Sequence, residues 1–113
     1  MNPSMYYRTL VPIPLLVAAC SATSLPSRPP DIVGVVQAVE PRILVVEQTS
    51  PNPDAILFST DARTRVVVRA PDGSRQEGTL ADVAIGATVR AWTRGVMLTS
   101  YPGQAAAEAF EVL

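Results

Sequence analysis

The fold is decided by residues 79–100, "TLADVAIGATVRAWTRGVMLTS". Thr79 is a residue type that caps helices, and Asp82 follows three positions later, where a carboxylate favours a helix start. The stretch therefore predicts one short helical turn over residues 80–83, which ends at Gly86. A brief helical turn followed by β-branched residues indicates a small β domain rather than a helical one.

Strand-like runs lie on both sides of this turn. After it, we expect residues 88–93 and 96–100 to form a hairpin across Arg94-Gly95. Gly34 interrupts the first run and predicts a bulge or a close backbone approach. The earlier strand-like runs are separated by turn residues and cover residues 32–39, 42–49, 55–60 and 63–70, with residues 75–79 as a weak return strand.

Several short strands, with one brief helical turn before the fourth main strand, predict an all-β fold, a small OB-like β-barrel. A small open β-sandwich is the alternative. The stretch "SYPGQAAAEAF" (100–110) ends a strand at Tyr101, because Pro102 cannot donate to a ladder and Gly103 permits positive φ. Barrel closure favours a last strand near residues 107–112, whereas the alanines would favour a helix over the same part.

The first nineteen residues predict a lipoprotein signal peptide. An apolar run from Leu10 to Ala19 follows a single arginine and is far too short to span a bilayer. It ends in Val17-Ala18-Ala19-Cys20, which resembles the lipobox of bacterial lipoproteins. That resemblance implies a lipid on Cys20 and cleavage just before it; ordinary secretion with cleavage near Ala22 is the alternative. Either Met1 or Met5 is the start.

The rest of the chain divides into a tether and a domain. Residues 20–30 predict a lipidated cysteine followed by a flexible Ser/Pro-rich tether, and residues 31–113 predict the barrel. Ser21 follows the cysteine, where Asp commonly marks inner-membrane retention in lipoproteins. We therefore expect a cell-envelope protein facing the periplasm or cell exterior, at the outer membrane if the cell has two membranes.

The composition argues against most enzyme classes. The chain has nine arginines, no lysine, no histidine, ten carboxylates and one cysteine. The usual neutral-pH base, the commonest metal ligand and every Schiff-base amine are therefore missing. We predict no enzyme, no metal and no cofactor. The formal net charge of −1 also makes nucleic acid an unlikely partner.

Taken together, several stretches resemble a known family. They include Gly34-Val35-Val36, the Leu-x-Asp-Val-x-x-Gly-x-x-Val element of residues 80–89, and Ser100-Tyr101-Pro102-Gly103-Gln104-Ala105. They are similar to the YobA-like family of small secreted or lipid-anchored bacterial domains. The resemblance covers residues 31–113; it implies an OB-like barrel at the envelope and no established activity.

Tyr101 is the first candidate contact residue. It stands beside a chain-reversing Pro-Gly pair, so a rigid loop would present its ring to a partner or a sugar. The structural alternative is that the ring plugs one end of the barrel, with its hydroxyl bonded to free backbone groups.

The second candidate is a stripe of Arg90, Trp92 and Arg94, which strand alternation places on one face. Such a stripe can stack a planar ligand or bind an anionic group. Alternatively, arginine stems simply cover the indole on a solvated face. Three more arginines are expected on a solvated face that would contact lipid phosphates or an acidic partner if it binds anything: Arg63, Arg65 and Arg69.

We therefore predict a non-enzymatic, lipid-anchored envelope module whose barrel binds a protein partner or a small ligand near Trp92 and Tyr101. The alternatives are an OB-type oligosaccharide or nucleic-acid binder, which would rest on the fold alone, and a stress-protective structural protein of the envelope.

Overall fold

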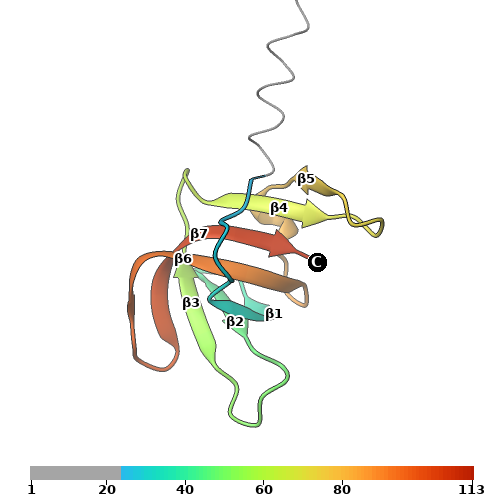
Figure 1. Cartoon of the computed structure of the whole chain (residues 1–113). Coiled ribbons are helices and arrows are strands. Elements are labelled where there is room, and N and C mark those ends of the chain that lie inside the picture. The colour runs from blue at the N-terminus through green and yellow to red at the C-terminus, as the bar shows by residue number, and fades with distance from the viewer. Residues whose placement is uncertain (1–23) are drawn as a thin grey trace, which may run out of the picture.

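The computed structural model describes residues 24–113 and shows an all-β domain (Figure 1). The predicted signal peptide and Cys20 lie outside the described residues. Among residues 24–113, no helix has the length and hydropathy that crossing a membrane requires. The elements are β1 (Ile32–Ala38), β2 (Ile43–Val46), β3 (Ala55–Ser59), β4 (Arg65–Arg69), β5 (Arg75–Glu77), the 3-10 turn η2 (Leu80–Asp82), β6 (Thr88–Leu98) and β7 (Gly103–Val112).

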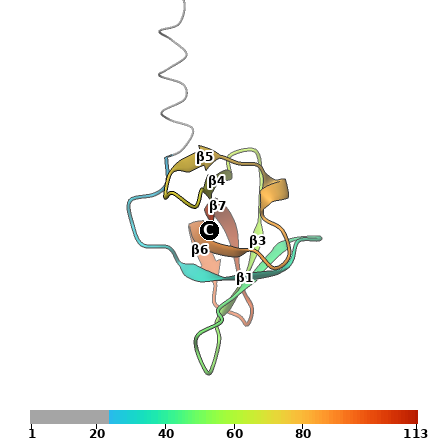
Figure 2. The ribbon, with the colours of Figure 1, turned by 90° about the vertical axis from the view of Figure 1, so that its right-hand side faces the viewer.

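The strands form one sheet that closes on itself. Its order is β3-β2-β1-β6-β7-β4-β5, and an additional parallel pairing joins β3 to β7. This pairing closes a five-stranded barrel of β1, β2, β3, β7 and β6, which confirms the predicted small OB-like barrel over the open sandwich. Figure 2 shows β4 and β5 extending the sheet beyond β7, on the side away from β1.

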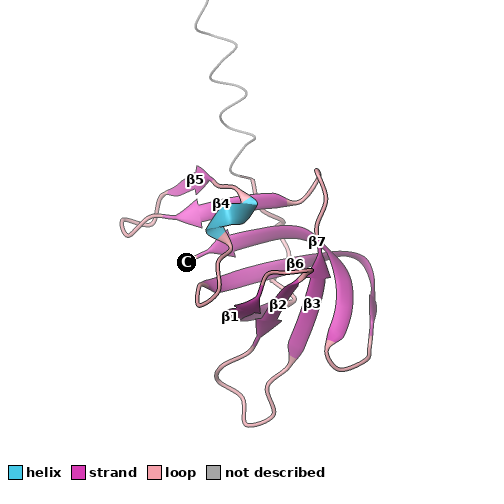
Figure 3. Cartoon of the chain, turned by 180° about the vertical axis from the view of Figure 1, so that it is seen from behind, coloured by secondary structure: helices cyan, strands magenta, loops and turns pink. Residues whose placement is uncertain are grey.

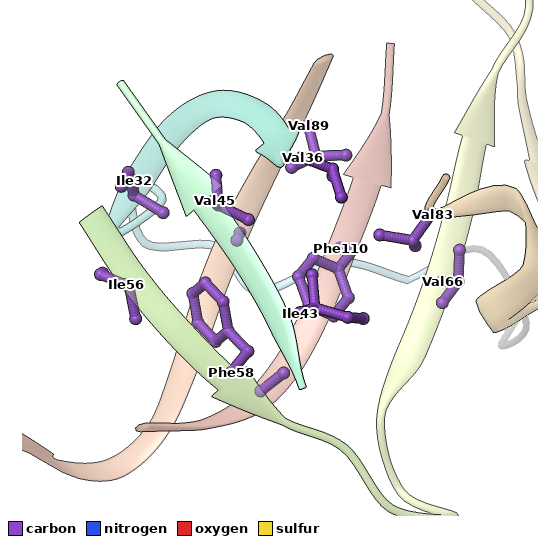
Figure 4. Close-up of a cluster of buried hydrophobic side chains, with 12 residues drawn as sticks. Ile32, Val36, Ile43, Val45, Ile56, Phe58, Val66, Val83, Val89 and Phe110 are labelled. Atoms are coloured by element: carbon purple, nitrogen blue, oxygen red, sulfur yellow. The ribbon is translucent and has the colours of Figure 1, made fainter. Parts of the chain in front are cut away.

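Alternating residues of the barrel strands fill its interior (Figure 4). The rings of Phe58 from β3 and Phe110 from β7 meet edge to face, with their centroids 5.3 Å apart. Aliphatic side chains surround them, including Val83, the residue that directly follows η2. The buried cluster consists of Ile32, Val36, Ile43, Val45, Ile56, Phe58, Val66, Val83, Val89, Ala91, Ala107 and Phe110.

The helical turn forms where the sequence predicts it. The backbone N–H of Thr79 donates to Asp82 Oδ2 at 2.8 Å, and the N–H of Asp82 donates to the Thr79 carbonyl at 2.9 Å. The first bond is the carboxylate half of a capping box, in which an acidic residue three positions on binds the N-terminal backbone N–H; the second is the backbone bond of the 3-10 turn itself. Gly86 then takes a φ of +92° and leads the chain into β6.

The end of the chain is a strand, as barrel closure requires, and not the alternative helix. The closing strand predicted near residues 107–112 is longer, because β7 begins at Gly103. The predicted hairpin across Arg94-Gly95 is wrong, since β6 runs unbroken through both residues and the turn to β7 lies at residues 99–102. The φ of +74° at Gly95 serves an irregularity within the strand instead of a turn.

Gly34 lies where two strands approach closely, as its place within β1 predicts. A methyl group at this position would overlap the Val46 carbonyl oxygen and lie 2.6 Å from its carbon. It would also lie 3.0 Å from the backbone nitrogen of Glu47. All three atoms belong to backbone, so only a shift of β2 against β1 makes room for a side chain.

Replacing Gly34 with alanine is therefore expected to lower the free energy of unfolding by about 1–3 kcal/mol, through overpacking. Urea unfolding monitored by the fluorescence of Trp92 measures this. Gln37→Ala, at an exposed position of the same strand, is the control and should change stability by less than about 0.5 kcal/mol. Equal stability of Gly34→Ala and the wild type would contradict the close approach.

Candidate functional site

The tip of the β6–β7 hairpin exposes apolar side chains. Val96, Leu98 and Tyr101 are 87%, 60% and 72% exposed, and Met97 is 36% exposed. We call these four residues the hairpin tip. Between the pairs Arg94–Ala106 and Leu98–Gln104, three residues of β6 lie opposite one residue of β7, so β6 is bulged there.

Tyr101 is fixed at the tip by its hydroxyl, which donates to the Pro53 carbonyl in the β2–β3 loop at 3.2 Å. Its ring remains exposed, so the interpretation of Tyr101 as a barrel plug is wrong. Ser100 also donates its hydroxyl to the Pro102 carbonyl at 2.9 Å, which holds the turn. An aromatic ring held this way is available to a partner without further ordering.

The hairpin tip is a mainly apolar exposed surface. Single exposed apolar residues are ordinary, but adjacent ones on a projecting hairpin are typical of a docking site. Its side chains offer dispersion and hydrophobic contacts, and the only polar group among them, the tyrosine hydroxyl, is already bonded. The surface therefore suits an apolar patch on another macromolecule better than a polar small molecule.

Trp92 is not part of an exposed stripe. Its side chain is 1% exposed, and its indole N–H donates to the Arg28 carbonyl at 2.8 Å. The Arg28 guanidinium reaches Thr93 and Glu108, at 2.6 and 2.9 Å, so the chain before β1 runs over the indole. In Figure 1 this segment crosses in front of β7 and β6. A ligand therefore has no free indole face to stack on, contrary to the sequence-based prediction.

The two arginines of the predicted stripe have different partners. Arg90 lies over the Trp92 ring, 5.4 Å from its centroid, and donates to Glu111 at 2.9 Å. Arg94 instead reaches Asp61, at 3.4 Å, and the Arg63 carbonyl, at 3.1 Å. The backbone N–H of Arg63, together with the nearby guanidinium groups, lowers the pKa of Asp61. The structure therefore does not join these side chains to Tyr101 in one surface.

Glu111 is the buried polar side chain of the domain. Although it lies on the outer side of β7, it is 0% exposed, because Arg69, Arg75 and Arg90 cover it. Burial raises the pKa of its carboxyl, but the hydrogen bonds and charges of Arg75 and Arg69 outweigh this and hold the pKa below its usual value. Glu111 is therefore charged near neutral pH.

Because the pKa of Glu111 is lowered in the folded state, the free energy of unfolding depends on pH in the acidic range. The stabilisation it provides is complete above its ordinary pKa of 4.5 and is lost as the pH falls through the lower folded-state value. We expect Glu111→Gln to be less stable at pH 7 by about 1–3 kcal/mol, the range for a lost hydrogen bond to a charged group. Below pH 4.5 the difference from the wild type should shrink.

Urea unfolding between pH 7 and pH 2.5 tests this expectation. Glu77→Gln, which removes an exposed carboxylate from β5, is the control. A stability difference between Glu111→Gln and the wild type that stays constant over the whole pH range would mean that Glu111 is not the linked group.

A second surface feature is a hollow of about 640 Å³ at the barrel end that η2 borders. Its floor includes the core residues Ile43, Phe58 and Val83, and its rim includes Leu80 and Ile85, which are 42% and 66% exposed. This hollow borders the end of β3, whereas Tyr101 contacts the loop before β3. The hollow and the hairpin tip are thus separate surfaces.

Within the described residues, no group of three or more His, Cys, Asp or Glu side chains is placed to hold a metal ion. Asp54 and Asp61 accept hydrogen bonds from the backbone N–H groups of Ala55 and Arg63, and Asp61 also pairs with the Arg63 and Arg94 side chains.

The comparisons with known proteins identify the family. The family model described as a protein of unknown function (DUF3221) matches residues 34–113. The chain belongs to this family. Comparison with curated proteins found no match, and comparison with solved structures found none either.

The match covers nearly all of the barrel, from Gly34 of β1 to the end of β7. The hairpin tip and Glu111 both lie inside the matched residues, whereas Arg28 lies before them. The family description assigns no function, so function rests on the surfaces themselves.

Sequence reasoning found Tyr101 but missed the apolar residues beside it. Residues 96–100 were expected to be a strand of a hairpin, and a strand pattern does not tell whether a third strand covers it. It also missed Glu111, and although it named Arg69 and Arg90, it did not place them together with Arg75 around this carboxylate. The sequence did contain one signal for this cluster: Glu111 stands between Phe110 and Val112 in the expected closing strand. A carboxylate that is covered at such a position requires cationic partners.

Proposed function

We propose that this chain is a non-enzymatic, lipid-anchored module of the cell envelope that docks a protein partner through the hairpin tip. The observation that carries the proposal is the exposed apolar set of Val96, Met97, Leu98 and Tyr101 on a hairpin whose turn is pinned by side-chain hydrogen bonds. Tyrosine, fixed and amphipathic, is a frequent energetic centre of protein interfaces.

The position of the tip supports a partner in solution rather than the anchoring membrane. The described chain begins beside β4 and β5, and the β6–β7 hairpin projects at the other end of the domain (Figures 1 and 3). Cys20, the proposed lipid site, precedes the first described residue, Ser24, by only four positions. With a lipid there, the tip would face away from the membrane.

Two finer assignments belong to the same proposal. The motifs of residues 34–36, 80–89 and 100–105 support membership of the YobA-like group of secreted or lipid-anchored domains. Ser21 after Cys20 supports the outer membrane in a two-membrane cell.

The absence of histidine and lysine from the sequence supports a binding role over an enzymatic one.

Lipidation predicts a covalent label on a single residue. In cells fed an alkyne-tagged fatty acid, the wild-type chain should be labelled and pellet with membranes. Cys20→Ser should lose the label and pass into the soluble fraction, because no other cysteine is present. Labelling that survives in Cys20→Ser would contradict the lipobox interpretation, as would an unlabelled wild type.

Docking through the tip predicts the loss of one partner on substitution. In-cell crosslinking with mass spectrometry should capture an envelope protein with the wild type, and Tyr101→Ala together with Val96→Ala should reduce that capture about tenfold, as for truncated interface centres. Both side chains are exposed, so the double variant should stay folded and lose about 1 kcal/mol with the hydrogen bond from Tyr101 to the Pro53 carbonyl.

Ile85→Ala is the matched control, because Ile85 is also exposed and apolar but borders the hollow. Capture lost in Ile85→Ala and kept in the tip variant would transfer the proposal to the hollow and to a small apolar ligand or a peptide seated there. Capture equal in all three proteins would contradict docking through either surface.

A further inference from the structure

The arginine cluster around Glu111 carries more positive charge than its carboxylate neutralises. Glu111 Oε2 lies 2.9 Å from Arg69 Nη2 and 2.9 Å from Arg75 Nε, and Oε1 lies 2.9 Å from Arg90 Nη1. Three guanidinium groups thus surround one carboxylate, leaving a local charge of about +2 on a chain with a formal net charge of −1. One or two arginines would have sufficed to pair Glu111.

The cluster retains free hydrogen-bond donors. Within residues 24–113 the three guanidinium groups donate to no protein atom other than Glu111, although each carries five N–H donors. Their side chains are 36%, 44% and 31% exposed, so the unused edges face solvent. Glu77 is the nearby carboxylate on β5, exposed and without an ion pair within 4 Å.

Strands hold the three groups in place. Arg69, Arg75 and Arg90 come from β4, β5 and β6, and Glu111 comes from β7 between β4 and β6. Arg69 and Arg75 are direct cross-strand partners, and so are Arg90 and Glu111. Like charges on paired positions repel each other. An additional anion at the exposed edges of the guanidinium groups would reduce this repulsion, which otherwise lowers the stability of the fold.

We propose that this cluster binds a phosphate-type oxyanion through the exposed edges of Arg69, Arg75 and Arg90, with Glu111 as the positioning residue beneath them. Guanidinium groups match tetrahedral oxyanions because two parallel N–H groups meet two oxygens. A bound phosphate-type anion would balance the positive charge of the three arginines that the Glu111 carboxylate leaves unneutralised. The site goes beyond partner docking and does not depend on the hairpin tip.

The phosphate would come from a lipid headgroup or from a free phosphate. The position of the cluster makes the headgroup source possible, because β4 and β5 lie at the end where the described chain begins (Figures 1 and 2). Arg28 and Arg65 share Glu108 there, which ties that segment to β4. The headgroup source rests on the proposed lipid anchor, whereas the free-phosphate source does not.

Side-chain NMR of the full chain in uncharged detergent micelles tests the site directly. Nine arginines and no lysine make the Nε–H signals few enough to assign. The probes are inorganic phosphate, with chloride at equal ionic strength as its reference, and separately micelles doped with phosphatidylglycerol. We expect saturable shifts of the Arg69, Arg75 and Arg90 signals, and a dissociation constant about tenfold higher in Arg75→Gln. Arg63→Gln, on a loop and paired with Asp61, is the matched control and should change the constant less than twofold.

Each result decides something. Shifts with inorganic phosphate assign a free-phosphate site, and shifts only with phosphatidylglycerol assign a headgroup site. No shift with either probe in the wild type overturns the proposal, even if Arg75→Gln fails to fold. Equal weakening by Arg63→Gln and Arg75→Gln also overturns it, because general charge attraction would then explain the binding. None of these results bears on the hairpin tip, so the docking proposal is tested separately.

Discussion

The structure depends on the double pairing of β7. The first half of this strand, Gly103–Ala106, pairs with β3 and closes the barrel, and the second half, Ala109–Val112, pairs with β4. Along its whole length it also pairs with β6. Alternation along the strand then places Phe110 in the core and Glu111 on the outer side. Without this one strand the barrel would be open, and the arginine cluster would lose its centre.

The outer side of β7 shows why an arginine-only composition suits this sheet. Its two glutamates, Glu108 and Glu111, bind five arginines that come from β4, β5, β6 and the segment before β1. A guanidinium can share a carboxylate with others because it approaches edge-on through a planar fork, whereas lysine ammoniums are compact, strongly hydrated point charges. Substituting lysines would therefore change the geometry of the cluster and not only its chemistry.

The barrel was predictable from sequence because its signals are local. β-branched runs, the Thr79–Asp82 pair and the strand-ending Pro102 each act within a few residues, and closure then required a final strand instead of the helix that alanines favour. The wrong prediction of a hairpin turn at Gly95 has the same origin, since a glycine with a positive φ occurs in turns and in bulges alike. The site was less predictable, because the burial of Trp92 depends on Arg28, 64 residues earlier, and Glu111 takes arginines 21 to 42 residues away.

The two proposed surfaces are independent in physical terms. Arg90 and Leu98 are eight residues apart on β6, on the order of 25 Å at ~3.3 Å per residue. The Debye length at physiological ionic strength is about 8 Å, so the charge of the arginine cluster is screened well before the hairpin tip. Any coupling between the arginine cluster and the hairpin tip would have to pass through the paired strands β6 and β7. The bulge between Arg94 and Leu98 interrupts the regular pairing of these strands, so a shift at one end is poorly transmitted to the other. An anion at one end and a partner at the other should therefore bind additively.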